Sequence, residues 1–291
     1  MQPLLWARAQ ASVRGDVAPM RTLAVALLLL LTAPTTARAD TGRAVPHPTV
    51  VGHRAKEGPN ENTLVALRWD AAHHTMCETD TWRIADAQGN PDHGISVIFH
   101  DKTIGRMTTP ESRAAAGLTK STPISTVEWW QFQLLRTPGG EPLPTLGEWL
   151  QEAADLHVAC MVEVKWGLSD PETSVRKAAL SGSSFYQRGQ QDADCSFAAL
   201  DRLQGLGAVV GVKVSAKCPL PPKEAAAGGY SYVALYQSAI TRASVDAYHA
   251  VGVDVSNMSV GNNPAVWQEL AAARVDYIIT SKPGELWKWL T

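Results

Sequence analysis

The stretch CETDTW, Cys77–Trp82, places two acidic residues one position apart inside a run that otherwise has the composition of a buried strand. Side chains alternate between the two faces of a strand, so Glu78 and Asp80 point to the same side. Two carboxylates on one buried face repel each other and lose hydration, which is costly unless a cation balances them. The stretch therefore predicts a cation site on a core strand.

The rest of the composition is that of an ordinary globular protein. The 291 residues are 45% hydrophobic and 19% charged, and the formal net charge is -2. Binding to nucleic acid usually requires a basic surface, so this near-neutral balance gives no electrostatic basis for a nucleic-acid partner.

The N-terminal segment has the pattern of a secretory signal peptide. An apolar run over residues 23–31 is followed by Ala37-Arg38-Ala39, a small-x-small cleavage site. A bilayer span needs about 20 apolar residues, so this run predicts no stable membrane span. We expect cleavage before Asp40 and a secreted product.

Cleavage at this point would divide the chain into a signal peptide, 1–39, and a single catalytic domain, 40–291. Residues 1–19 lack the signal pattern, so Met20 is a candidate start. The remaining length is close to the roughly 250 residues of one (β/α)8 TIM barrel.

Short apolar, β-branched runs alternate with helical patterns along this domain. The predicted strands are 49–53, 75–82, 96–100, 158–165, 208–216, 231–237, 253–260 and 275–280. The intervening helical patterns include NENTLVALRWDAAHH, LPTLGEWLQEAADL, CSFAALDRLQGLG, RASVDAYHAVG and PAVWQELAAAR. This alternation predicts a parallel sheet with helices outside it. Segment 166–207 is ambiguous because no strand stands out in it. If a strand ends there near Ser196–Phe197, one of the eight segments above is not a barrel strand.

Polar residues recur at the C-terminal ends of the predicted strands, where parallel barrels carry their functional groups. These ends read His53-Arg54, Glu78-x-Asp80, His100-Asp101 and Glu163-x-Lys165. The three carboxylates of Glu78, Asp80 and Glu163 are hard oxygen ligands without sulfur, which favours Mg²⁺ or Ca²⁺ over zinc.

The remaining side chains of this set suit a phosphate substrate. Arg54 and Lys165 supply fixed positive charge for an anion. His53 and His100 can transfer protons at the two ends of a bond that breaks. A cation site, two basic side chains and an acid–base pair together predict the cleavage of a phosphoester.

A series of motifs carries a family resemblance over roughly residues 48–285. In chain order they are GHRAKEGPNENTLVAL, CETDTW, VIFHDKTIGRMTT, LPTLGEWL, VEVKW and VDYIITSKP. They resemble the signature of the glycerophosphodiester phosphodiesterase family, a group of phospholipase C-like TIM barrels. The resemblance implies a (β/α)8 barrel that uses a divalent cation to hydrolyse small glycerophosphodiesters to glycerol 3-phosphate and an alcohol.

The resemblance also implies roles for individual residues. It implies that Glu78, Asp80 and Glu163 bind the metal, and that His53 and His100 act as acid and base. Further, it implies that Arg54 holds the phosphate, that Lys165 lies near the substrate oxygens, and that Glu61 and Asn62 support the site. Glu61 would support the metal site or His53.

Other positions bear on the pocket and its surroundings. Trp82 and Trp166 follow ligand-bearing strand ends and are candidates for the pocket wall. The chain departs from the family pattern at Ser281, where the family usually has aspartate.

The four cysteines of the domain fall into two pairs of different character. Cys77 and Cys160 lie at odd offsets from the acids, which predicts small core residues that face the helices. Cys195 and Cys218 flank one helix–strand unit, and a disulfide between them is geometrically feasible in a barrel.

Two other functions stay open at this stage. One is a phospholipase D-like activity on lysophospholipid or sphingomyelin, which would use a similar site with a lipid-facing rim. The other is a non-catalytic barrel that binds phosphate or carbohydrate, which would have no need for both histidines.

Overall fold

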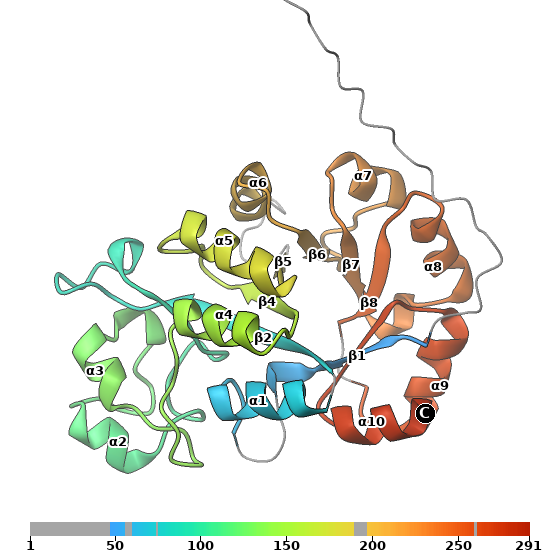
Figure 1. Ribbon diagram of the computed structural model, residues 1–291. Coiled ribbons are helices and arrows are strands. Elements are labelled where there is room, and N and C mark those ends of the chain that lie inside the picture. The colour runs from blue at the N-terminus through green and yellow to red at the C-terminus, as the bar shows by residue number, and fades with distance from the viewer. Residues whose placement is uncertain (1–46, 56–59, 74, 189–196, 259–260) are drawn as a thin grey trace, which may run out of the picture. The chain divides into compact units, whose positions relative to one another are not determined.

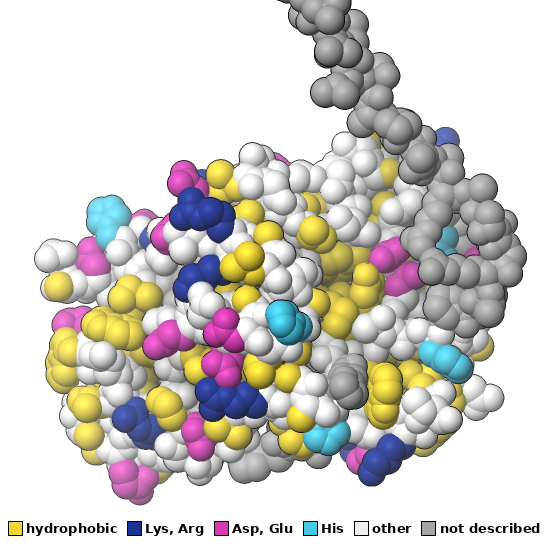
Figure 2. Space-filling view, in the orientation of Figure 1, with side chains coloured by type: hydrophobic (Ala, Val, Ile, Leu, Met, Phe, Trp, Pro, Cys, Tyr) yellow, Lys and Arg dark blue, Asp and Glu magenta, His cyan; other side chains and the backbone are white. Residues whose placement is uncertain are grey.

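The computed structural model describes residues 47–55, 60–73, 75–188, 197–258 and 261–291, all within one compact unit, Arg38–Thr291. The predicted signal peptide, 1–39, lies outside the described residues. Among the residues described, no helix has the length and apolar character that crossing a bilayer requires. On the face in Figure 2, Lys and Arg side chains lie interspersed with Asp and Glu.

Eight parallel strands of the described chain close into a barrel (Figure 1). The closure is made by β1, which pairs with both β2 and β9. The strands are β1 (Thr49–Gly52), β2 (Met76–Arg83), β4 (Cys160–Val164), β5 (Ser184–Arg188), β6 (Val210–Lys213), β7 (Tyr232–Leu235), β8 (Asp254–Asn257) and β9 (Tyr277–Thr280). The predicted (β/α)8 TIM barrel is confirmed.

A helix follows each barrel strand and packs outside the sheet, as Figure 1 shows. These helices are α1 (Leu64–Ala72), α4 (Leu146–Asp155), α5 (Pro171–Ser181), α6 (Ala198–Gly205), α7 (Pro222–Ala227), α8 (Arg242–His249), α9 (Pro264–Ala273) and α10 (Pro283–Leu290). All five quoted helical patterns form helices. In α4, for example, Thr145 and Glu148 form a reciprocal capping box, and Trp149 and Leu150 face the barrel core.

The prediction that segment 96–100 is a barrel strand is wrong. The strand within it, β3 (Ser96–Ile98), pairs antiparallel with the end of β2 and forms a hairpin beside the barrel. It belongs to an insertion between β2 and α4 that also holds η2 (Pro91–His93), α2 (Pro110–Ala115), η3 (Ile124–Thr126) and α3 (Trp129–Leu134). This insertion has its own hydrophobic core, which includes Phe99 and Phe132.

The barrel strand that the sequence did not reveal is β5, within the ambiguous segment. It ends at Arg188, not near Ser196–Phe197, and Phe197 is the N-cap of α6. The short run Ser184–Arg188 is followed by a polar stretch, so its apolar signal is only Phe185 and Tyr186. Two short 3-10 helices, η1 (His53–Ala55) and η4 (Gln237–Ala239), follow β1 and β7.

Cys77 and Cys160 are buried core residues, as predicted, but they are also joined by a disulfide that the sequence analysis did not predict. They lie opposite each other in the β2–β4 register and form a disulfide with a Cα–Cα distance of 4.5 Å. Both side chains do face the helices, because they belong to the core between sheet and helices. Cys218 is also disulfide-bonded, but its predicted partner Cys195 lies outside the described residues.

Replacing both cysteines, Cys77→Ala with Cys160→Ala, is expected to lower the free energy of unfolding by about 4 kcal/mol. The bond joins residues separated by 83 positions, and closing so long a loop removes much entropy from the unfolded chain. Urea denaturation monitored by circular dichroism measures the change. Either single alanine variant should cost nearly as much as the pair, since each alone breaks the bond; separate losses that sum to the double would contradict the prediction.

Candidate active site

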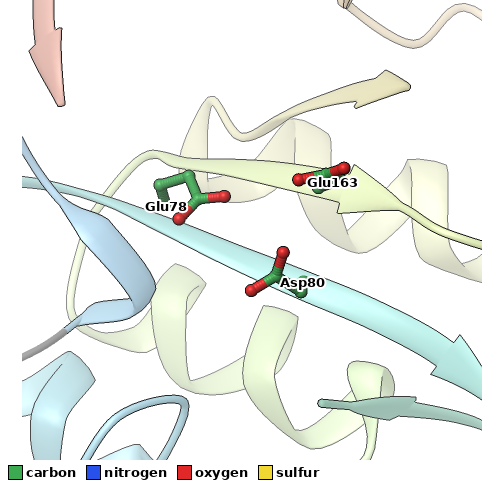
Figure 3. Close-up of side chains that lie close together, drawn as sticks. All are labelled: Glu78, Asp80 and Glu163. Carbon is green, nitrogen blue, oxygen red and sulfur yellow. The ribbon is translucent and has the colours of Figure 1, made fainter. Parts of the chain in front are cut away.

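Three carboxylates from two neighbouring strands meet inside the barrel (Figure 3). Glu78 and Asp80 come from β2, and Glu163 comes from β4, where it lies opposite Asp80 in the register. All three are buried, with exposed fractions of 2%, 1% and 3%. One oxygen from each lies within 4.8 Å of the others. The structure therefore places the three predicted ligands on one face, as expected from the alternation of the strand.

This arrangement fits a hard divalent cation. Carboxylate oxygens bind Mg²⁺ at about 2.1 Å and Ca²⁺ at about 2.4 Å, so two ligand oxygens across one ion lie roughly 4 to 5 Å apart. The cluster has that spacing and contains only carboxylate ligands. Below it, the barrel interior is closed by a layer that includes Met161, Tyr186, Tyr232 and Ile279.

Glu78 and Glu163 are in opposite electrostatic situations. Burial, reinforced by the charges of Asp80 and Glu163, raises the pKa of Glu78 to about 7. Tyr186 donates a short hydrogen bond to Glu78 Oε1, and the backbone N–H of Arg54 donates to Oε2 at 3.0 Å. Near neutral pH this carboxyl carries a proton part of the time, and a cation bound to it would expel that proton.

Two lysines surround Glu163. Lys165 Nζ lies 2.8 Å from Glu163 Oε1 and 3.0 Å from Asp80 Oδ1, and Lys213 Nζ contacts Glu163 Oε2. Burial alone would raise the pKa of Glu163, but the two ammonium groups outweigh it and hold that pKa well below its usual range. Burial likewise opposes the charge of Lys165, but Asp80 and Glu163 raise its pKa above the ordinary value.

His53 and Arg54 follow β1 in a strained turn. Arg54 has φ 60°, in the left-handed region that non-glycine residues rarely adopt, and this turns its N–H toward Glu78. His53 Nε2 is 4.0 Å from Glu78 Oε2, and its Nδ1 is 3.2 Å from Ser281 Oγ. Burial, followed by the charge of Arg54, lowers the pKa of His53 to about 3. Its ring is therefore unprotonated at neutral pH.

The guanidinium of Arg54 lies between the acids and His100. Its Nη1 is 3.2 Å from Glu61 Oε1 and its Nη2 is 2.7 Å from His100 Nε2. The Nε is buried and has no hydrogen-bond partner among the described residues, although it lies 3.9 Å from Asp80 Oδ2. A buried donor of this kind is suited to an anionic ligand.

Glu61 and Asn62 support the site in different ways. Glu61 pairs with Arg54 and, at 2.7 Å, with Arg106 Nη2. Asn62 donates to Asp80 Oδ2 at 3.3 Å and accepts from Thr79 Oγ1 at 2.9 Å. Glu61 thus orients the arginine, whereas Asn62 orients a predicted metal ligand.

His100 reaches the site from the insertion and not from a barrel strand. Its Nδ1 lies 2.6 Å from Asp101 Oδ1, and Arg106 in turn holds Asp101 through Nε at 2.6 Å. Trp82 donates to the His100 carbonyl at 3.1 Å. The hairpin therefore places His100 beside Arg54 at the site, where the sequence analysis had expected the end of a barrel strand to place it.

The two predicted wall residues stack on each other. The Trp82 and Trp166 ring centroids are 6.5 Å apart with an interplanar angle of 22°. Trp82 is buried, whereas Trp166 is 46% exposed and therefore presents aromatic surface to solvent. Trp166 directly follows Lys165, so this surface borders the site.

Sequence reasoning missed Tyr186, Lys213, Arg106 and the contact of Ser281 with His53. Tyr186 was missed with its strand, β5. Lys213 lies on a predicted strand, two positions after Gly211, and the shared face could have been read from that spacing. Gly211 is on the inner face because a Cβ there would lie 2.3 Å from the Tyr232 ring. Arg106 and Ser281 occupy loops, where alternation gives no information.

Comparison with known proteins identifies relatives of the fold. The sequence matches no protein-family model, and no curated protein matches it either. Among solved structures, a glycerophosphodiester phosphodiesterase from Agrobacterium tumefaciens str. C58 is similar, with a TM-score of 0.63 and 19% identity over 83% of this chain and 99% of that one. An enzyme of the same name from Parabacteroides distasonis has a TM-score of 0.63 and 17% identity, covering 84% of this chain and 97% of its own.

A third similar structure contains a product. It is an Oleispira antarctica phosphodiesterase in complex with sn-glycerol-3-phosphate, with a TM-score of 0.63 and 18% identity over 83% of this chain and 96% of that one. At such identities the likeness establishes the fold. The TIM barrel that the motif resemblance implied is therefore confirmed by these structures.

Proposed function

We propose that the protein is a metal-dependent phosphoric diester hydrolase that converts glycerophosphodiesters to glycerol 3-phosphate and an alcohol. The observation that carries the proposal is the meeting of three buried carboxylates, two imidazoles and a buried arginine donor at one place in the barrel. Solved structures with this fold that are named glycerophosphodiester phosphodiesterases support the choice of substrate.

In this proposal Glu78, Asp80 and Glu163 hold Mg²⁺ or Ca²⁺. When bound, such an ion supplies positive charge that stabilises the phosphoryl oxygens in the transition state. Arg54 and Lys165 bind and orient the phosphate. Asn62 keeps Asp80 in place, and Glu61 does the same for Arg54.

His53 and His100 divide the proton transfers. The unprotonated ring of His53 takes the proton from the attacking oxygen, either the neighbouring glycerol hydroxyl or water. His100 is assigned the proton transfer to the departing alcohol, and the Asp101 carboxylate on its Nδ1 orients the ring for that transfer. Attack by the glycerol hydroxyl would give a cyclic phosphate that water then opens.

Lipid substrates form the second candidate class. The exposed face of Trp166, stacked on Trp82 beside the site, supplies aromatic surface that an acyl chain or a lipid head group can contact. This observation favours a lysophospholipid or sphingomyelin as the alternative substrate. A barrel that binds phosphate without turning it over is the remaining alternative.

An assay on two substrates separates these functions. We expect glycerol 3-phosphate to be released from glycerophosphocholine, with a loss of at least about a hundredfold in EDTA and recovery on addition of Mg²⁺ or Ca²⁺. Turnover of lysophosphatidylcholine alone would favour the lipid enzyme. Turnover of neither with metal supplied would leave the binding barrel, and full activity in EDTA would exclude the metal-dependent mechanism.

We also propose that the protein is exported, on the basis of its N-terminal sequence pattern. The disulfides at Cys77–Cys160 and Cys218 support this, because such bonds persist mainly in oxidising compartments. N-terminal sequencing of the protein recovered from culture medium should begin at Asp40.

A further inference from the structure

Lys213 is the basic residue of the site for which the proposed chemistry has no role. It is the last residue of β6, and its side chain points into the barrel on the same face as Gly211. Only 13% of the side chain is exposed. Its ammonium group contacts Glu163 Oε2 and lies 4.9 Å from the centre of the Tyr186 ring.

Two lysines offset part of the negative charge of the three-carboxylate cluster when no ion is bound. Glu163 has one lysine on each oxygen, Lys165 on Oε1 and Lys213 on Oε2. Lys165 also reaches Asp80, but Glu163 is the carboxylate partner of Lys213 in this structure. Three carboxylates buried in one barrel would otherwise be strongly destabilising, because each loses hydration and repels the others.

A divalent cation needs the oxygens that the lysines hold. An ion bound by all three carboxylates takes at least one oxygen of Glu163, because Glu163 is one of the three. Both Glu163 oxygens carry an ammonium group. An ion that binds Glu163 therefore lies close to two positive charges, and release of one of those contacts would lower the repulsion. Among the described residues, Lys165 forms ion pairs with two acids and Lys213 with one, which makes Lys213 the easier group to displace.

We propose that Lys213 is the resident counter-cation of this site: it stabilises the acidic cluster when no metal is bound, and it is displaced from Glu163 when the metal binds. This inference rests on the metal site of the proposed function, and it adds Lys213 to that site as a residue that controls metal binding. Lys213 therefore sets the affinity of the site by competing with the ion for Glu163.

The proposal predicts two effects of opposite sign for Lys213→Met. The variant should bind Ca²⁺ about tenfold more tightly by isothermal titration calorimetry, because no ammonium competes for Glu163. In EDTA its melting temperature should fall by roughly 5 °C, because a buried carboxylate loses its partner. A residue with a merely structural role would lower the stability without raising the affinity for the ion.

Two other variants control for charge and for packing. Lys213→Arg keeps the positive charge and should stay near the wild type in both measurements. Lys177→Met removes a lysine whose ammonium binds the Gly147 carbonyl on the outer helices, and it should leave Ca²⁺ affinity unchanged. A crystal structure of the wild type with Ca²⁺ tests the displacement directly and does not depend on the folding of any variant.

Each outcome decides the matter. Unchanged or weaker Ca²⁺ binding in Lys213→Met overturns the proposal, as does a Ca²⁺-bound structure in which Lys213 still contacts Glu163. Absence of Ca²⁺ binding by the wild type overturns it together with the assigned ligands. The proposed function is judged separately, by turnover of glycerophosphocholine, so it can stand when the role of Lys213 fails.

Discussion

Glu78→Gln is expected to reduce divalent-ion affinity by more than a hundredfold and to remove metal-dependent turnover. Residues that only support metal ligands already cost about 10- to 100-fold when changed, and Glu78 is itself one of three ligands in the cluster. Glutamine retains the size of the side chain and one oxygen, which can accept from the Arg54 N–H while its amide NH2 group donates to the Tyr186 hydroxyl. The loss would therefore reflect the charge and not a cavity.

The same variant should stabilise the metal-free protein above neutral pH. The folded state raises the pKa of Glu78 from 4.5 to about 7, so between these values the folded protein binds more protons than the unfolded chain. Stability then falls as the pH rises through this window, and above it the ionised carboxyl costs up to about 3 kcal/mol. Glutamine cannot ionise and avoids that cost.

Calcium titration by calorimetry and urea denaturation in EDTA at pH 8 measure the two effects. Glu152→Gln is a matched control, because it makes the same change at an outer ion pair with Arg68. Tight Ca²⁺ binding by Glu78→Gln would contradict the ligand assignment. A metal-free variant less stable than the wild type at pH 8 would contradict the electrostatic account.

The barrel was predictable because seven of its strands contain short apolar or β-branched runs that alternate with helical patterns. The eighth was not, since β5 is short and its strand character rests mainly on Phe185 and Tyr186. Segment 96–100 has the composition of a barrel strand, but composition does not report the direction in which a strand pairs. Its partner is the end of β2, and only the fold fixes that antiparallel contact.

The acidic cluster was predictable for a simpler reason. Period-two spacing fixes the common face of Glu78 and Asp80, and the parallel register brings Glu163 opposite Asp80. The disulfide depends on that same register, because Cys77 and Cys160 also lie opposite each other. Their spacing from the acids indicated which face they occupy, but the sequence contains no information on which strands are neighbours.

The charges around the cluster were the least predictable part. A lysine on a strand is usually exposed, so the sequence alone does not indicate a role for Lys213. Its role becomes visible only when the fold shows that its side chain reaches Glu163 inside the barrel. The contacts of Arg106 with Glu61 and Asp101 arise from the folding of the insertion back onto the site. Such contacts depend on loop paths, which follow no periodic rule.

His53→Ala and His100→Ala are each expected to lower kcat by a factor of about 10² to 10⁴ and to change KM only a few-fold. Acid–base groups act on protons that move in the transition state, so their loss is expressed mainly in kcat. Steady-state rates on glycerophosphocholine measure the effect. His157→Asn is a suitable control, since it lies in the turn before β4 with φ 55°, and asparagine tolerates that left-handed conformation.

The two histidines can then be told apart by the leaving group. If His100 protonates the departing alcohol, a substrate whose leaving group needs no proton should bypass it. A glycerophosphate diester of p-nitrophenol is such a substrate, because p-nitrophenol leaves as a stable phenolate. We therefore expect the loss in His100→Ala to shrink to within about tenfold on this ester, whereas the loss in His53→Ala should persist, because the attacking oxygen still has to lose its proton. Equal losses for both variants on both substrates would refute the division of roles. Recovery of His53→Ala alone would reverse it, and the Asp101 carboxylate beside His100 would then serve to orient the base.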